Sequence, residues 1–150
     1  MRYYLDSEST GFGGGLISLA LVREDGESVY WVIGDFDKDA VTPWVAANVI
    51  PVLANCIGQT DVLPHAKLAR RIARWLSGDR DPVIIADWPD DIRHFCEAII
   101  TGPGSMIKLP SLRFEVRRIR TYPTGLKGAV RHNAWWDAMA LRYVLEAVGT

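Results

Sequence analysis

The chain has 150 residues and a formal net charge of −1, with 49% hydrophobic and 23% charged residues. This length and composition suit one globular domain with a buried core, since domains commonly span about 100 to 200 residues. The near-neutral charge excludes a uniformly basic nucleic-acid-binding protein, and we find neither a signal peptide nor an apolar stretch long enough to cross a bilayer. Cys56 and Cys96 form no disulfide or metal-binding pattern. We therefore expect a single cytoplasmic domain that does not associate with membranes.

The first 33 residues of the chain are typical of three consecutive strands. These are the segments Arg2–Ser9, Leu16–Arg23 and Ser28–Ile33. Asp25-Gly26 lies between the last two, and this pair favours a tight hairpin turn. We therefore expect three antiparallel strands.

The rest of the chain alternates helices with strands. Thr42-Pro43 opens a helical run through Leu53, where Thr suits the N-cap and Pro the first helical position. A second helix over residues 63–77 has an apolar face and a basic face, which we interpret as solvated surface. The remaining elements are a buried strand at 82–88, a helix from Pro89 to about residue 100, a strand at about 112–119 and a last helix over Ala134–Val148. The order βββααβαβα predicts an α/β fold with a mixed sheet of about five strands flanked by helices.

Two carboxylates lie on one face of the first strand. Alternation places Asp6 and Glu8 on the same side, with their Cα atoms about 7 Å apart by strand rise. Exposed acids are common, so this pair alone also fits a solvated edge or strand end.

A third carboxylate, Asp137, lies in the apolar stripe of the last helix. The other members of this stripe are Ala134, Ala140, Leu141, Val144 and Val148. A lone charge there would cost several kcal/mol unless it were protonated or met a cation, although a first-turn acid is also stabilised by the helix dipole. His132 can face the same site only if the helix begins after it, and Asn133 is a suitable N-cap. A lone histidine of this kind is often structural, so its role depends on the other site residues.

The segment PVIIADWPDDIRHF supplies a fourth carboxylate. On a helix that begins at Pro89, Asp91 faces the body of the protein together with Phe95. The residues toward the other side are Asp90, His94 and Glu97. Asp87 or Asp90 could replace Asp91 if the helix began a residue or two away.

Together these motifs resemble the DEDD superfamily of 3′–5′ exonucleases, in its histidine-bearing branch. LDSESTGF is similar to the first motif, an Asp-x-Glu strand followed by Thr-Gly, and RHNAWWDAMAL is similar to the third, a His followed five residues later by Asp. ADWPDDIRHF corresponds to the middle motif, which is the loosest of the three. YYLDSE, the hairpin at REDGES and the WVAANVIPVL helix look most like small bacterial exoribonucleases of the RNase AS type.

This resemblance implies an RNase H-like fold and removal of nucleoside 5′-monophosphates from the 3′ end of single-stranded RNA, or alternatively DNA. It implies two divalent cations, Mg²⁺ or Mn²⁺, that clamp the attacking and leaving oxygens. The implied metal ligands are Asp6, Glu8, Asp91 and Asp137, with His132 as the general base. The implied contacts to the substrate are Ser9, Thr10, Gly11, Phe12 and Arg131, where the Phe12 ring can stack on a base. The resemblance also implies a homodimer.

Three other features have more than one interpretation. GFGGG precedes a strand and lacks a Gly-Lys-Ser/Thr ending, so we interpret it as a flexible connection and not as a phosphate-binding loop. The basic run from Lys108 to Arg131 could steer a phosphate backbone or form an ordinary half-exposed strand. Trp135 and Trp136 are expected in the core or at a subunit interface.

The alternative function is a fold relative that binds nucleic acid or protein without cleaving it. Uncompensated carboxylates on inward faces favour an enzyme, because a binding module has no need of them.

Overall fold

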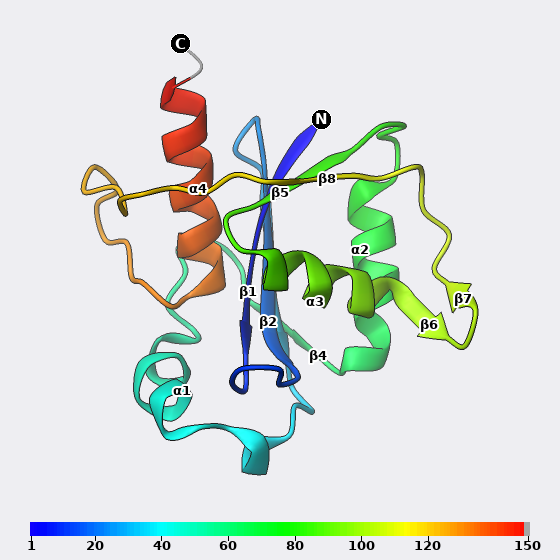
Figure 1. The fold of residues 1–150 in the computed structure, drawn as a ribbon, viewed down its shortest axis with the longest axis horizontal. Helices are drawn as coiled ribbons and strands as arrows, with labels where there is room; N and C mark the ends of the chain where they lie inside the picture. The colour runs from blue at the N-terminus through cyan, green and yellow to red at the C-terminus, as the bar shows by residue number, and fades with distance from the viewer. Residues whose placement is uncertain (149–150) are drawn as a thin grey trace.

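The structure is a computed structural model that describes residues 1–148, and a six-stranded mixed sheet forms its centre (Figure 1). The strands are β1 (Arg2–Ser9), β2 (Leu16–Arg23), β3 (Ser28–Ile33), β4 (Asp61–Leu63), β5 (Val83–Ala86) and β8 (Arg113–Val116). Their order is β4-β3-β2-β1-β5-β8. The expected antiparallel pairing of the first three strands is confirmed, whereas β4 and β5 pair in parallel with β3 and β1, and β8 pairs in parallel with β5. β1 is therefore an inner strand.

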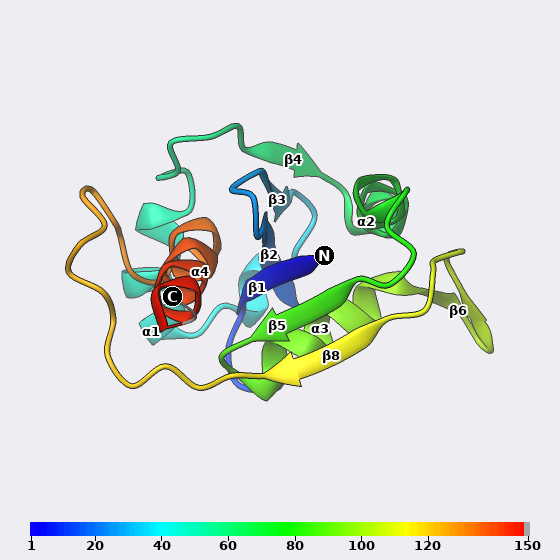
Figure 2. The same ribbon diagram turned by 90° about the horizontal axis from the view of Figure 1, so that it is seen from above.

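Helices cover both faces of the sheet (Figure 2). α2 (Leu68–Leu76) and α3 (Pro89–Ile99) pack on one face, and α4 (Ala134–Val148) packs on the other. α1 (Pro43–Asn48) packs through Val45 beside the end of β2. Short 3-10 turns occupy Lys38–Ala40, Ile50–Val52 and His65–Lys67, and β6 (Ile100–Gly102) pairs with β7 (Ser105–Met106) in a separate hairpin.

The alternation of side chains along β1 decides which layer each residue enters. Tyr3 and Leu5 are buried against α2 and α3, whereas Tyr4 is buried under α4. Because successive side chains point to opposite faces, Asp6 and Glu8 continue the α4 face and Ser7 continues the α3 face. β1 therefore brings polar groups into both layers at one end of the sheet.

The expected helix over residues 63–77 is wrong in its first part. Asp61–Leu63 forms β4, which pairs with Trp31–Ile33, and α2 begins only at Leu68. Leu63 precedes Pro64, and the residue before a proline is sterically pushed to an extended conformation. The sheet consequently has six strands instead of about five.

Smaller differences occur at three other places. α1 ends at Asn48 and a 3-10 turn continues it, because Pro51 disfavours the α conformation at Ile50. The loop expected after the third helix forms the β6–β7 hairpin, and the strand expected at 112–119 is limited to the four residues of β8. The side chain of Val148, expected in the apolar stripe of α4, lies outside the described residues.

Two further findings concern the chain as a whole. Cys56 and Cys96 are free thiols. Across residues 1–148, no helix combines the length and apolar character needed to cross a membrane.

Candidate active site

The N-terminus of α4 places His132 beside Asp137. The Asn133 Oδ1 accepts a hydrogen bond from the Trp136 backbone N–H (3.1 Å), so the helix begins after His132, as expected. His132 has φ 65°, in the left-handed region, and its backbone N–H donates to Asp137 Oδ2 (2.9 Å). The incoming loop thus folds back over the first turn. The ring of Trp44 meets the imidazole edge to face, with centroids 4.9 Å apart.

Glu8, His132 and Asp137 form the closest group at this site. One potential ligand atom from each lies within 4.8 Å of the other two. Asp6 does not belong to this group, but it lines a cavity of about 130 Å³ together with His132 and Asp137. The structure therefore brings the acids of β1 to the same place as the histidine and the acid of α4.

Asp91 reaches the site from the other face of β1. It is 5% exposed, and its Oδ1 accepts hydrogen bonds from the Ser7 backbone N–H (3.1 Å) and from the Ser7 hydroxyl (2.6 Å). Asp90 instead pairs with Arg93 (2.5 Å). Asp87 accepts a hydrogen bond from the Ile119 backbone N–H (2.8 Å). Of the three alternatives for the middle acid, Asp91 is the one attached to β1.

The expectation that His94 points away with Asp90 and Glu97 is wrong. His94 is buried, with 3% of its surface exposed, and its Nε2 lies 3.2 Å from Arg93 Nη2. The buried face of α3 is wider than the stripe of Asp91 and Phe95, because this end of the helix also borders the turn after β1. His94 therefore separates the main cleft from a neighbouring cavity.

Burial raises the pKa of every carboxyl group in this cluster. The pKa rises to about 8 for Glu8, about 7 for Asp91 and about 6 for Asp137. Burial and the neighbouring carboxylates raise the pKa of Asp6 well above its usual range. Hydrogen bonds from Ser7 and from His132 oppose these shifts at Asp91 and Asp137. The cluster is thus costly to ionise in the absence of a counter-charge.

The part of the chain that the structure describes offers these acids no basic partner within ion-pair distance. Its ion pairs involve neither Asp6 and Glu8 nor Asp91 and Asp137. Asp137 Oδ1 is also buried without a geometric hydrogen-bond partner among these residues, although the nearby Tyr122 hydroxyl and the charge of Arg131 partly oppose the rise that burial causes in the pKa of Asp137. Buried, unpaired carboxylate oxygens fit hard divalent cations such as Mg²⁺ or Mn²⁺.

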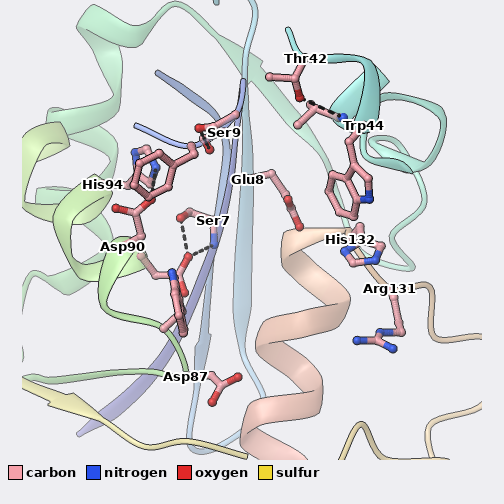
Figure 3. Close-up of a pocket in the computed structure, with 15 residues that line it drawn as sticks. Ser7, Glu8, Ser9, Thr42, Trp44, Asp87, Asp90, His94, Arg131 and His132 are labelled. Carbon is pink, nitrogen blue, oxygen red and sulfur yellow. Dashed lines mark hydrogen bonds and ion pairs between the residues drawn. The ribbon is translucent and has the colours of Figure 1, made fainter. Parts of the chain in front are cut away.

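A cleft of about 780 Å³ opens onto this cluster. Figure 3 shows Ser7 and Asp90 on one wall, Trp44 and His132 on the other, and Glu8 between them. Burial lowers the pKa of His132, and the charge of nearby Arg131 adds to this effect. Both effects favour the neutral imidazole, which is the form that can accept a proton.

Most of the residues expected to contact the substrate line this cleft. They are Ser9, Gly11, Phe12 and Arg131, and the Phe12 side chain is fully exposed. Thr10 is different, because its side chain is buried, with 2% of its surface exposed. GFGGG forms a closed turn, in which the Thr10 N–H donates to the Gly15 carbonyl oxygen (3.0 Å). A Cβ atom at Gly14 would lie 2.2 Å from Thr10 Oγ1, so a residue with a side chain would clash at this position.

Sequence reasoning missed three residues of the site. Ser7 holds Asp91, Trp44 contacts His132, and Tyr122 lines the cavity beside Asp137. The alternation of β1 could have assigned Ser7 to the α3 face. No comparable local signal marks Trp44, which the short helix α1 brings to the site, or Tyr122, which lies in the loop before α4. Trp135 and Trp136 are buried, which confirms their expected place in the core.

Comparison with known proteins gives a partial match. No protein-family model matches the chain. The 3′–5′ exoribonucleases of two Mycobacterium tuberculosis strains, CDC 1551 and H37Rv, are each 40% identical to it over 55 residues. The match covers 35% of this chain, and the chain spans about a third (33%) of the length of the curated relatives it matches. The chain is thus similar to a 3′–5′ exoribonuclease over part of its length.

Proposed function

We propose that the protein is a metal-dependent 3′–5′ exonuclease of the histidine-bearing DEDD branch, with single-stranded RNA as its substrate. The observation that carries the proposal is the cluster of Asp6, Glu8, Asp91 and Asp137, which three elements bring together without a basic partner within ion-pair distance in the described chain. Buried charges in a purely structural network are normally paired. The partial similarity to mycobacterial 3′–5′ exoribonucleases supports the same class of activity.

The four acids would hold two divalent cations, Mg²⁺ or Mn²⁺. When bound, such cations stabilise the attacking and leaving oxygens of a phosphodiester displacement. Glu8 and Asp137 already approach one another, and Ser7 fixes one carboxylate oxygen of Asp91, so that its second oxygen is available as a ligand. Asp6 borders the cavity next to Asp137 and would complete the set.

His132 would act as the general base. An imidazole titrates near neutral pH, so it can accept a proton from the attacking water at a ring nitrogen. The backbone bond to Asp137 and the contact with Trp44 hold His132 at the wall of the cleft. These contacts keep the imidazole beside the carboxylates of Glu8 and Asp137.

The cleft itself would bind the 3′-terminal nucleotide. Gly11 and Ser9 present backbone and hydroxyl groups near Glu8, and the exposed Phe12 ring offers a surface for a base. The product would be a nucleoside 5′-monophosphate.

End-labelled oligonucleotides test this proposal. We expect RNA with a free 3′ end to be shortened only when Mg²⁺ or Mn²⁺ is present, and RNA with a blocked 3′ end to survive. Asp6→Ala should abolish the reaction, whereas Asp39→Ala, at an exposed acid outside the cleft, should not. DNA strands run in parallel decide the sugar preference. Degradation without metal, cutting of blocked ends or an active Asp6→Ala variant would contradict the mechanism, and binding without degradation would favour a silent binding module.

A further inference from the structure

An exposed indole and a guanidinium meet at one end of the cleft. Trp88, the residue before α3, is 55% exposed and lines the cleft. The Arg118 guanidinium, which follows β8, lies over the indole with its Cζ 4.7 Å from the ring centroid. Arg118 Nε is also 3.3 Å from Asp87 Oδ1, and the same carboxylate binds the Ile119 backbone N–H. Asp87 and Trp88 therefore hold Arg118 and Ile119 against the cleft. The last two belong to the basic run from Lys108 to Arg131, called the basic segment below.

A second pair in the molecule shows what a structural version of this contact looks like. The Arg23 guanidinium lies 5.8 Å from the Trp75 ring centroid and pairs with Asp25. Trp75, however, is partly buried and packs edge to face on Tyr3, with ring centroids 5.3 Å apart. Trp88 belongs to none of the hydrophobic clusters found in residues 1–148. The part of its ring that Arg118 leaves exposed is available to a ligand in the cleft.

The segment that follows β8 is rich in basic side chains, although the chain has a net charge of −1. Arg117, Arg118, Arg120 and Lys127 are all exposed. Arg120 and Lys127 have no acidic partner within ion-pair distance among the residues described here. An exposed aromatic ring under a guanidinium, at the start of a segment of exposed basic side chains, suits a single nucleic-acid strand, whose phosphates meet the cations while its bases stack.

We propose that Trp88 and Arg118 bind the strand upstream of the scissile phosphate, with a base stacked on the indole and its phosphate near the guanidinium. This inference rests on the proposed exonuclease function, which places the terminal nucleotide beside Ser9 and Phe12. Figure 3 shows Ser9 at one end of the cleft, Asp87 at the other and Glu8 between them. A strand that enters with its 3′ end at Phe12 therefore leaves past Trp88 toward the basic segment.

Binding of a fluorescein-labelled RNA octamer, with Ca²⁺ in place of Mg²⁺ or Mn²⁺, measures this subsite apart from turnover. Trp88→Ala should weaken the octamer Kd about tenfold, since base stacking on an aromatic ring contributes about 1–3 kcal/mol. Trp88→Phe should retain most of the affinity. Arg118→Ala should lower the slope of log Kd against log salt by about 0.7, the value for one phosphate contact on a single strand. Arg23→Ala, at the matched pair, should change neither quantity.

A scan with abasic nucleotides then shows whether a base is the ligand of Trp88. In the wild-type protein, an abasic site at one upstream position should cost about as much affinity as Trp88→Ala, and in Trp88→Ala the same abasic site should cost little. Equal Kd values for the wild-type protein and a folded Trp88→Ala variant, or the same abasic profile in both, would overturn the inference. If Trp88→Ala does not fold, a folded Trp88→Leu variant with wild-type affinity would overturn it as well.

The two proposals can fail separately. Degradation of RNA by the wild-type protein, with an unchanged KM in Trp88→Ala, would remove the upstream subsite and leave the exonuclease. Tenfold weaker binding by Trp88→Ala, without degradation by the wild-type protein, would support the subsite and remove the exonuclease.

Discussion

Ser7 organises the candidate site. It lies between Asp6 and Glu8 on β1, and its side chain points to the opposite face of the sheet from theirs. Asp6 and Glu8 point to the α4 face of β1, whereas Ser7 binds Asp91 on the α3 face through both its hydroxyl and its backbone N–H. One tripeptide therefore sets the positions of three carboxylates. A small polar residue is needed here, because an apolar side chain would leave the buried Asp91 carboxylate with one hydrogen bond fewer.

The choice among the acids of the middle motif leads to a prediction about single substitutions. Asp91→Asn keeps an oxygen for the bonds from Ser7 but removes the charge. The kcat for RNA degradation should therefore fall by at least about 100-fold, which is the largest loss usual for a residue that only supports a metal ligand. Asp90→Asn and Asp87→Asn should change kcat by less than about threefold, since Arg93 already pairs with Asp90 and an amide oxygen can still accept from the Ile119 N–H. Steady-state turnover of labelled RNA measures this. The reverse order of effects would make Asp87 or Asp90 the middle ligand.

Elements governed by local rules were predictable from the sequence, and elements governed by distant partners were not. β1, β2 and β3 have the expected bounds because short runs of strand-forming residues and the Asp25-Gly26 turn specify them locally. Asp61–Leu63 becomes a strand because it pairs with the free edge of β3, about thirty residues earlier in the chain. The local pattern does not reveal that partner, so we expected part of this segment to be helical. The same division applies to the site: the faces of the acids followed from periodicity, whereas the tertiary position of α1 brings Trp44 to it and the loop before α4 brings Tyr122.

The N-terminus of α4 is the element on which the position of His132 depends. Asn133 caps the helix through Oδ1, and its Nδ2 donates to the Val52 carbonyl oxygen (2.9 Å) next to α1. The cap thus joins α4 to the 3-10 turn that follows α1, the helix that carries Trp44 to the cleft. Loss of the cap should affect both stability and the position of the imidazole.

Asn133→Ala should lower the free energy of unfolding by about 1–2 kcal/mol, because it removes a helix cap and a buried hydrogen bond. Asn133→Asp should recover part of this loss, since its carboxylate can still accept from the Trp136 N–H. Denaturant unfolding measures both variants, and Asn55→Ala, at an exposed asparagine, serves as the control. If Asn133→Ala and the control have the same free energy of unfolding, the first turn of α4 does not depend on the Asn133 cap.

At the scale of the whole molecule, the fold gathers its most costly charges at one end of the sheet. The acids lie where β1, α3 and α4 meet, and burial raises the pKa of each of them. The sequence predicted that these acids converge, but the tight approach of Glu8 to His132 and Asp137 depends on how α4 crosses the sheet. Such a cluster opposes folding in the metal-free protein, and a bound cation would remove that opposition.

The stability of the metal-free protein should therefore fall as the pH rises from about 4 to 8. In the unfolded chain these carboxyl groups lose their protons near pH 4. In the folded state the pKa is about 6 for Asp137, about 7 for Asp91 and about 8 for Glu8, so the folded protein binds more protons over this interval and the slope of the unfolding free energy against pH is negative. In EDTA, the Tm should drop by about 5 °C or more between pH 5 and pH 8.

Divalent cations should reverse this trend, which calorimetry or thermal denaturation followed by circular dichroism can measure. Mn²⁺ or Mg²⁺ should raise the Tm more at pH 8 than at pH 5, because at low pH protons compete for the same carboxylate oxygens. Asp6→Asn removes one charge from the cluster, so it should raise the Tm in EDTA at pH 8 and reduce the gain from the cation. A Tm in EDTA that rises between pH 5 and pH 8, together with no response to either cation, would mean that these acids are not the ligands of a metal centre.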